Sequence, residues 1–304
     1  MIDLSDVKSE DALPHYDDYK TLSSALSAFA PHDGGFDIAD GLLHIVRSTE
    51  VQSETTCVLS QPSICIVPQG AKQVTLADTT FEYDYRKMVV YSAAVPISIR
   101  VTQASKQAPY FCLVIPLQPE ALHRLSAKVF PDGVPERKST RAVYVRDATA
   151  GIVSAANRMF SILAEQTDAD LLVPHCIDEI LIRLLRSKMG PEVLQIAQAD
   201  SAIRKVSKAI SWINSHFEQP LSIDSLASLA GMSVSAFHSH FKAVTALSPL
   251  QFQKRLRLQH ARTLLREGRS GVTTSALEVG YTSASQFSRE YFREFGHPPW
   301  QELP

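Results

Sequence analysis

The spacing of apolar and polar residues divides the chain into a strand-rich part and a helical part. Between Phe36 and about Leu117, short runs of β-branched and aromatic residues alternate with turn residues such as Pro62 and Pro96. The runs are Leu42–Arg47, Ile64–Val67, Gln73–Leu76, Met88–Ser92, Ile97–Val101 and Tyr110–Ile115. Many short strands with regular turn signals are typical of a sandwich or barrel. We therefore expect residues 36–117 to form a β-barrel.

From residue 119 onward, apolar residues recur at helical spacing. Pro119–Val129 predicts a helix that begins with proline, and residues 128–145 are irregular. Two longer helices are expected over Ala148–Gln166 and Asp168–Lys188, the second ended by Gly190–Pro191. The second helix has a wide apolar stripe, made up of Leu171, Leu172, Ile177, Ile180, Leu181, Leu184 and Leu185. This stripe packs on the barrel, forms a homodimer interface, or does both on different faces.

The last hundred residues contain one helical pattern twice. After a helix over Ser201–Phe217, Ser222 is placed to cap a short helix that Gly231 ends, and a further helix covers Ser233–Ala243. A short helix, a glycine turn and a second helix form the helix-turn-helix pattern. The first copy therefore predicts one DNA-reading unit.

The second copy uses the same residue types. Thr273 or Thr274 is expected to cap a helix over Ser275–Val279, Gly280 makes the turn, and Ser283 caps a helix that ends at Phe295. Between the copies, Pro249–Arg266 predicts a helix of about 27 Å. Successive major grooves on one face of B-DNA lie about 34 Å apart. One chain can therefore present two recognition helices to adjacent grooves.

These C-terminal residues resemble the AraC/XylS regulators over about residues 201–303. The matching runs are Ala230–Lys242, Ser248–Pro249, Arg255–Leu265, Val279–Tyr291 and Phe295–Pro299. The first half resembles the AraC-type N-terminal domain of one subgroup in Pro62–Gly70, Tyr91–Pro96 and Ala108–Tyr110. This resemblance implies a cupin-like barrel with trailing helices, used for effector sensing and dimerisation. Ala246, Ala77 and Arg86 depart from the pattern, because the family often has glycine there.

The expected fold class is α+β, in two domains. Residues 1–190 form an effector-sensing and dimerisation domain, with the barrel at about 36–117, helices over 119–188 and a short helix over 22–29. Residues 191–200 are the expected linker. Residues 201–304 form an all-α domain in which a long helix joins two helix-turn-helix units.

Charge is distributed unevenly along a chain whose net charge is −2. Residues 201–304 contain twelve Lys and Arg against seven Asp and Glu, and the remaining residues are acidic. This asymmetry favours the C-terminal part as the one that meets a polyanion. No run of about 18 apolar residues indicates a membrane span, and Met1–Lys20 lacks the features of a secretory signal. We therefore expect a cytoplasmic protein without a membrane partner.

Residues beside the buried aromatic positions of each second helix are the candidates for DNA contact. Arg289 suits a guanine edge and Gln286 an adenine edge; the alternative for each is a solvated polar face. The candidates are Ser235, His238, Ser239 and Lys242 in the first unit, and Ser285, Gln286 and Arg289 in the second. Of Lys254, Arg255, Arg257 and Arg262 on the connecting helix, some are expected to meet phosphates and others to form ion pairs on the helix surface. The expected partners are double-stranded promoter or operator DNA, a second copy of the chain, a small-molecule effector and RNA polymerase, which an activator would contact.

The barrel is expected to bind a small organic effector rather than to catalyse a reaction. Its candidate lining residues are Tyr91, Arg100, Tyr110 and Cys112, and a buried Arg100 would need an anion. The alternatives are a barrel that only dimerises, or a thiol switch at Cys65 or Cys112. No metal or other cofactor is expected, because the sole His-x-His pair, His238 and His240, lies on a helix, where the two side chains diverge.

Two enzyme classes are remote alternatives. A cupin-type metalloenzyme needs clustered ligands, and His44 has no histidine two residues away. DNA alkyl repair favours a Pro-Cys-His-Arg setting, whereas this chain has Pro174-His175-Cys176 within an apolar helical stripe. The remaining cysteine, Cys57, is not part of a C-x-x-C pair either. We therefore expect no enzymatic activity.

Overall fold

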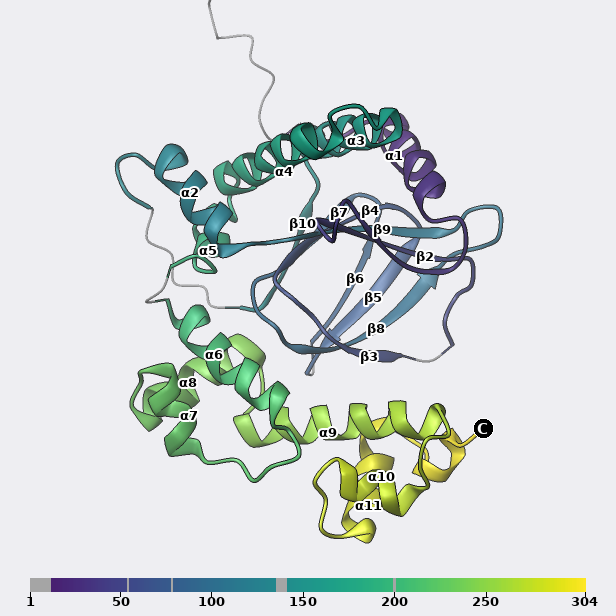
Figure 1. Cartoon of the computed structure of the whole chain (residues 1–304), viewed down its shortest axis with the longest axis vertical. Helices are drawn as coiled ribbons and strands as arrows, with labels where there is room; N and C mark the ends of the chain where they lie inside the picture. The colour runs from purple at the N-terminus through teal and green to yellow at the C-terminus, as the bar shows by residue number, and fades with distance from the viewer. Residues whose placement is uncertain (1–11, 54, 78, 135–140, 199–200) are drawn as a thin grey trace, which may run out of the picture.

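The computed structural model has a β-rich N-terminal part and an all-helical C-terminal part (Figure 1). The residues that it describes are 12–53, 55–77, 79–134, 141–198 and 201–304. The strands are β1 Gly34–Ile38, β2 Leu43–Ser48, β3 Thr56–Leu59, β4 Ser63–Gln69, β5 Ala71–Leu76, β6 Thr79–Asp84, β7 Lys87–Tyr91, β8 Pro96–Gln103, β9 Tyr110–Pro116 and β10 Val143–Asp147. The α+β prediction is confirmed.

Two antiparallel sheets face each other and enclose an apolar interior. One has the order β1-β2-β9-β4-β7-β10 and the other β3-β8-β5-β6. On β9, Tyr110 and Cys112 belong to the interior between the sheets, whereas Phe111 and Leu113 belong to a second core on the outside. The six-stranded sheet is therefore buried on both faces, which is why its strands are almost continuously apolar.

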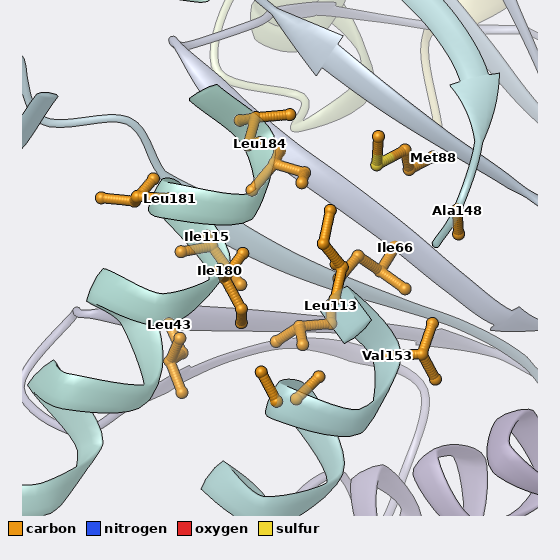
Figure 2. Close-up of a cluster of buried hydrophobic side chains, with 14 of the residues drawn as sticks. Leu43, Ile66, Met88, Leu113, Ile115, Ala148, Val153, Ile180, Leu181 and Leu184 are labelled. Atoms are coloured by element: carbon orange, nitrogen blue, oxygen red, sulfur yellow. The ribbon is translucent and has the colours of Figure 1, made fainter. Parts of the chain in front are cut away.

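Helices of the N-terminal part cover the outer face of the six-stranded sheet (Figure 1). They are α1 Tyr16–Phe29, α2 Pro119–Val129, α3 Ala150–Glu165, α4 Ala169–Arg186 and α5 Gly190–Leu194. Figure 2 shows Val153 of α3 and Ile180 of α4 beside strand residues such as Leu113 in one apolar cluster. The buried half of the predicted stripe, Ile180 to Leu185, packs here, whereas Leu171 and Leu172 remain exposed.

Several predicted boundaries in this half were wrong. Strands β1, β3 and β6 were not expected, β10 lies in the segment predicted to be irregular, and α1 is longer than the expected helix. The long helix α4 ends at Arg186, two residues before the predicted Lys188, and the predicted stop at Gly190 also begins α5. Val193 and Ile196 are buried in the first core, so the connection between the two parts starts later than residue 191.

The C-terminal part has the predicted tandem arrangement. Its helices are α6 Ala202–Ser215, α7 Ile223–Ala230, α8 Val234–Thr245, α9 Pro249–Arg266, α10 Val272–Glu278, α11 Ala284–Phe295 and the 3-10 helix η2 Pro299–Glu302. Serines cap five of them through bonds from backbone amides, as predicted for Ser222 and Ser283. The predicted threonine caps were wrong, because α10 begins one residue after Gly271 and its cap makes no side-chain bond.

Two alanines adopt backbone conformations that favour glycine. Ala246 ends α8 with φ 61° and Ala77 has φ 50° in the turn after β5. Both stand where the related regulators often have glycine, so the departures noted in the sequence carry a local energetic cost. Arg86 is different, because its guanidinium pairs with Asp84 at 2.8 Å in the turn between β6 and β7.

The connecting helix α9 lies against the four-stranded sheet, near β3 and β8 (Figure 1). Arg262 of α9 donates from Nη1 to the carbonyl oxygen of Thr55 at 3.2 Å. The two halves of the chain therefore meet along the face of the barrel opposite to α3 and α4.

Candidate DNA interface and barrel interior

The first candidate reading helix, α8, separates buried and exposed residues as predicted. Phe237 and Phe241 are fully buried and their rings contact each other edge to face. The four predicted contact residues, Ser235, His238, Ser239 and Lys242, are all exposed. Ser233 fixes the start of the helix by accepting a bond from the amide of Ala236 at 3.3 Å. The helix can therefore offer one polar face without disturbing its core.

The second candidate reading helix, α11, repeats this arrangement. Phe287 and Tyr291 are fully buried, and Ser285, Gln286 and Arg289 are exposed. Within the described ranges, Arg289 makes no hydrogen bond or ion pair, so its guanidinium is free to bind a partner. Gln286 has a long bond of 3.3 Å to Glu290, the residue one turn further along.

Arg257 has a structural role instead of the predicted phosphate contact. Its guanidinium donates to the carbonyl oxygens of Phe217 at 2.6 Å and Gly280 at 2.8 Å. It also donates to Glu218 and Gln219 at 3.0 Å each. Because these carbonyls belong to the loop after α6 and to the turn of the second unit, Arg257 joins the two units. Gln253 adds two bonds to the same loop, and the sequence analysis did not identify it.

The contact between the two helix-turn-helix units, which we call the Arg257 joint, also depends on Gly280 in the turn of the second unit. Gly280 has φ +88°, and a Cβ there would lie 2.2 Å from the carbonyl oxygen of Glu218. Only glycine allows this close approach of two backbones. The turn predicted at Gly280 therefore also sets the contact between the two reading units.

Two more of the four candidates on α9, Lys254 and Arg255, form ion pairs with the second reading helix. Lys254 pairs with Glu290 at 3.2 Å, and Arg255 pairs with Glu294 at 2.8 Å. Burial would raise the pKa of Glu290, but bonds from Tyr281, Gln286 and Lys254 outweigh it and lower that pKa. Both cations are therefore engaged within the domain, and they stabilise the packing of α9 against α11.

Near the end of the chain, the carboxylate of Glu302 accepts hydrogen bonds or ion pairs from several side chains. It accepts from Arg262 at 2.5 Å and from the Tyr291 hydroxyl at 3.2 Å, and it pairs with Arg266 and His297. Burial would raise the pKa of Glu302, but the bonds from the two arginines outweigh it and lower that pKa. Arg262 is itself almost fully buried, so its predicted phosphate contact is replaced by this internal pair.

Three of the four predicted lining residues face the barrel interior. Tyr91, Tyr110 and Cys112 are buried side by side with Tyr83 and Cys65. Arg100 was placed wrongly. It is paired with Gln73 across β8 and β5 and donates to it at 3.0 Å, while its strand neighbour Val101 faces the interior. Since successive strand residues point to opposite faces, Arg100 lies on the outer face of the four-stranded sheet.

The interior also contains a cation that the sequence analysis missed. Lys72 on β5 is paired with Val101 on one side and Tyr83 on the other, and both partners face inward. Its ammonium lies 6.0 Å from the centroid of the Tyr110 ring. The signal was present, since Lys72 precedes the inward-facing Val74 and Leu76 at the alternate spacing of one strand face.

The neighbouring Cys65 thiol lowers the pKa of Cys112 to about 7. The neighbouring Cys112 and burial raise the pKa of Cys65. The positive charge of Lys72 acts to lower the pKa of each thiol, but for Cys65 the other causes outweigh it. Three phenols, two thiols and one lysine therefore share one apolar interior.

Neither a metal centre nor a membrane helix stands out in the described part of the chain. No three His, Cys, Asp or Glu side chains come together there in a way that would hold a metal ion. No described helix is both long enough and apolar enough to cross a bilayer. Cys176, the candidate for alkyl repair, is buried in α4.

Two exposed helix-turn-helix units behind a cupin-like barrel define a class of bacterial-type regulators. The family of AraC-type transcriptional regulator N-termini matches residues 41–192, and a helix-turn-helix family matches residues 226–302. The first match spans half of the chain. The chain therefore belongs to the AraC family of transcriptional regulators, as its sequence motifs implied.

Relatives of known identity match only part of the chain. The transcriptional activator RhaS of Escherichia coli SMS-3-5 is 28% identical over 148 residues, which are 49% of this chain and 53% of RhaS. RhaS of Shigella boydii is 32% identical over 121 residues, which are 40% of this chain and 43% of that protein. The chain thus aligns with about half the length of these curated relatives.

The overall fold is also similar to that of a solved regulator. The structure of wild-type ToxT from Vibrio cholerae with a bound unsaturated fatty acid covers 85% of this chain and 92% of ToxT. The TM-score is 0.52 at 9% sequence identity. This likeness confirms the fold, a β-rich N-terminal part followed by a helical C-terminal part.

Proposed function

We propose that this chain is a sequence-specific transcriptional regulator that reads operator DNA with α8 and α11. The observation that supports this most strongly is the free polar face of each helix, combined with the Arg257 joint that fixes the two units to each other. A fixed spacing between reading helices lets one chain contact two major grooves. RhaS is named an activator, and we extend activation, with RNA polymerase as partner, to this chain as part of the proposal.

We further propose that the N-terminal part, up to about residue 197, senses a small organic effector and forms a homodimer. The inward-facing polar groups of the barrel support the first role, and the exposed leucines of α4 support the second. ToxT has been crystallised with an unsaturated fatty acid, which shows that this fold accommodates an organic ligand in that protein.

Arg289→Ala tests the reading role. We expect affinity for the preferred site to fall about 5- to 150-fold, equivalent to 1–3 kcal/mol, and base preference to relax at one base pair. Lys242→Ala is the control at the exposed last turn of α8; we propose that Lys242 contacts a phosphate, so all sequences should weaken alike and the salt slope should fall by about one. Site selection from random DNA measures both. An unchanged base preference for the Arg289 variant would contradict the assignment.

A thiol switch is the second candidate for signal input, because Cys65 and Cys112 are buried together inside the barrel and the pKa of Cys112 is lowered to about 7 by the neighbouring Cys65 thiol. Replacing both with alanine separates the two candidates. A ligand sensor should keep its response in cells, whereas a thiol sensor should lose it. Burial of both sulfurs favours the ligand sensor, since access of an oxidant is restricted.

A further inference from the structure

Glu290 on the second reading helix contacts three neighbouring polar groups. Its Oε2 accepts a hydrogen bond from the Tyr281 hydroxyl at 2.9 Å, and its Oε1 accepts one from Nε2 of Gln286 at 3.3 Å. The ammonium of Lys254 on α9 lies 3.2 Å from the same Oε1, and the side chain of Glu290 is only 15% exposed. Both carboxylate oxygens therefore have partners, and the carboxylate is held in one orientation behind the exposed Gln286.

The contact with Glu290 decides which way round the amide of Gln286 lies. An ionised carboxylate only accepts hydrogen bonds, so it requires the Nε2 end of the amide and excludes the Oε1 end. Burial acts to raise the pKa of Glu290, but the bonds that it accepts outweigh burial and lower that pKa, so the group is ionised at neutral pH. Nε2 has a second hydrogen, and Oε1 of Gln286 makes no bond to any described residue. The exposed end of Gln286 therefore offers one donor and one acceptor in a fixed order.

A donor and an acceptor in a fixed order are complementary to the major-groove edge of adenine. Adenine presents N7 as an acceptor and its N6 amino group as a donor, and a glutamine amide binds both at once. An amide without a fixed partner can rotate by half a turn, which exchanges its donor and acceptor, and ordering it on binding costs free energy. An acceptor fixed behind the amide therefore raises discrimination without itself contacting the DNA.

The first reading unit lacks this arrangement. The helices α8 and α11 correspond residue by residue, since each has a serine cap followed four residues later by a buried phenylalanine. In this alignment Ala236 stands at the position of Gln286, and His240 at that of Glu290. Alanine has no amide to orient. The oriented amide is therefore a property of the second unit and not of the fold that both units share.

We propose that Glu290 is a positioning residue that fixes the amide of Gln286 for reading adenine. This inference rests on the proposed reading of operator DNA by α11 and adds the residue that sets its specificity at one base pair. Tyr281 holds the second oxygen and keeps the carboxylate from turning away. Lys254 neutralises a negative charge that would otherwise repel the phosphates of bound DNA.

Site selection from random DNA by the full-length protein and its variants tests the proposal. Gln286→Ala should lower discrimination at one A·T pair about tenfold, which identifies the pair that this side chain reads. Glu290→Ala should lower discrimination at the same pair about three- to tenfold, and the double variant should lose no more than Gln286→Ala alone. Glu278→Ala, which removes an exposed carboxylate of α10, is the matched control and should leave every base preference unchanged.

Glu290→Gln separates positioning from charge. It removes the ion pair with Lys254 but keeps a side-chain oxygen that can accept from Gln286, so the preference at the A·T pair should survive. Thermal unfolding of each variant checks that it is folded. If Glu290→Ala does not fold, the glutamine variant decides, because loss of the preference in a folded Glu290→Gln protein would overturn the proposal.

The other outcomes are equally decisive. If Glu290→Ala weakens binding to all sequences alike, Glu290 only packs α9 against α11. If it relaxes a pair that Gln286→Ala leaves intact, Glu290 reads a base itself, and if Gln286→Ala relaxes no pair, there is no reading amide to position. Each of these results overturns the proposal and leaves the sequence-specific regulator standing. A wild-type protein that selects no sequence would instead refute the proposed function, and the role of Glu290 with it.

Discussion

Basic residues of the DNA-binding part differ in what they contact, although they look alike in the sequence. Among the described residues, Arg289 and Lys242 are exposed and their side chains make no hydrogen bond or ion pair. Arg257 and Arg262 instead donate to groups within the protein. Periodicity places all four near a predicted surface, but it cannot show which carbonyls and carboxylates of distant segments lie beside them. Assigning DNA contacts therefore requires knowing each cation's partners, not only its position on a helix.

Replacing Arg257 with alanine should destabilise the C-terminal part. Four hydrogen bonds to carbonyl oxygens are lost, and those of Glu218 and Gly280 lose their side-chain donor, whereas Gln253 still donates to Phe217 and Gln219, so we expect a loss of about 3 kcal/mol. Arg257→Lys should recover little, because an ammonium cannot reproduce the planar fork. Arg289→Ala is the matched control and should change stability by less than about 0.5 kcal/mol. Urea unfolding of residues 201–304 measures all three, and equal stabilities would refute the joint.

Glu302 should make the stability of the same part depend on pH. Its pKa is lowered in the folded protein, so its contribution is fully present above the unfolded value of about 4.3 and is lost as the pH falls through the lowered folded value. Glu302→Gln removes the charge with which Arg262 pairs at 2.5 Å, and we expect a loss of about 2–3 kcal/mol at pH 7. The variant should also show a flatter decline between pH 5 and pH 3. A parallel decline in both proteins would contradict this assignment.

At the scale of elements, helices with serine caps were predictable and several strands were not. The tandem units follow from local signals, because Ser222, Ser233 and Ser283 each satisfy an amide of their own helix. Strand β10 had no such signal. It forms because Val143–Asp147 pairs with the distant β7, an interaction that no local pattern contains. The wrong placement of Arg100 has the same cause. Its outward direction depends on the register of β8 with β5, which the local sequence does not contain.

The end of helix α8 offers a direct test of one such local signal. Ala246 adopts φ 61°, where a Cβ is unfavourable, and glycine there removes the strain. After subtracting the greater freedom of glycine in the unfolded chain, Ala246→Gly should stabilise by about 0.5–1 kcal/mol. Ala243→Gly, at an exposed position inside α8, is the control and should destabilise by about 1 kcal/mol. Thermal unfolding of both variants measures this. If Ala246→Gly does not stabilise the protein, the backbone conformation at residue 246 carries no energetic cost.

At the scale of the whole molecule, the six-stranded sheet lies between the proposed effector-binding interior and the proposed dimerisation helices. Its inner face contributes to the barrel interior, and its outer face carries α3 and α4 (Figure 1). The sequence predicted the barrel and the trailing helices, but an almost continuously apolar strand has no polar face to indicate direction. Which residues line the interior could therefore be read only from the paired sheets.

The exposed end of α4 leads to the last prediction, which concerns assembly. Leu171 is 63% exposed and Leu172 is 43% exposed at the start of α4. Further along the helix, Val173, Cys176, Ile180, Leu181, Leu184 and Leu185 are buried. Neighbouring large apolar side chains on a surface favour a partner, and a second copy of the chain satisfies this by two-fold symmetry. We expect the full-length protein to sediment as a dimer and the double variant Leu171→Glu/Leu172→Glu to sediment as a monomer that remains folded.

Ser27→Glu on α1 is the control, because Ser27 is exposed on a different helix and should leave the dimer intact. Residues 201–304 alone should be monomeric, since they lack α4, yet they should still bind DNA weakly through both reading units. Their affinity should fall steeply with salt, with a slope near −5 for about six phosphate contacts. A full-length protein that sediments as a monomer would remove the role of α4. A fragment that binds no DNA at low salt would instead show that the two units cannot read DNA without the N-terminal part.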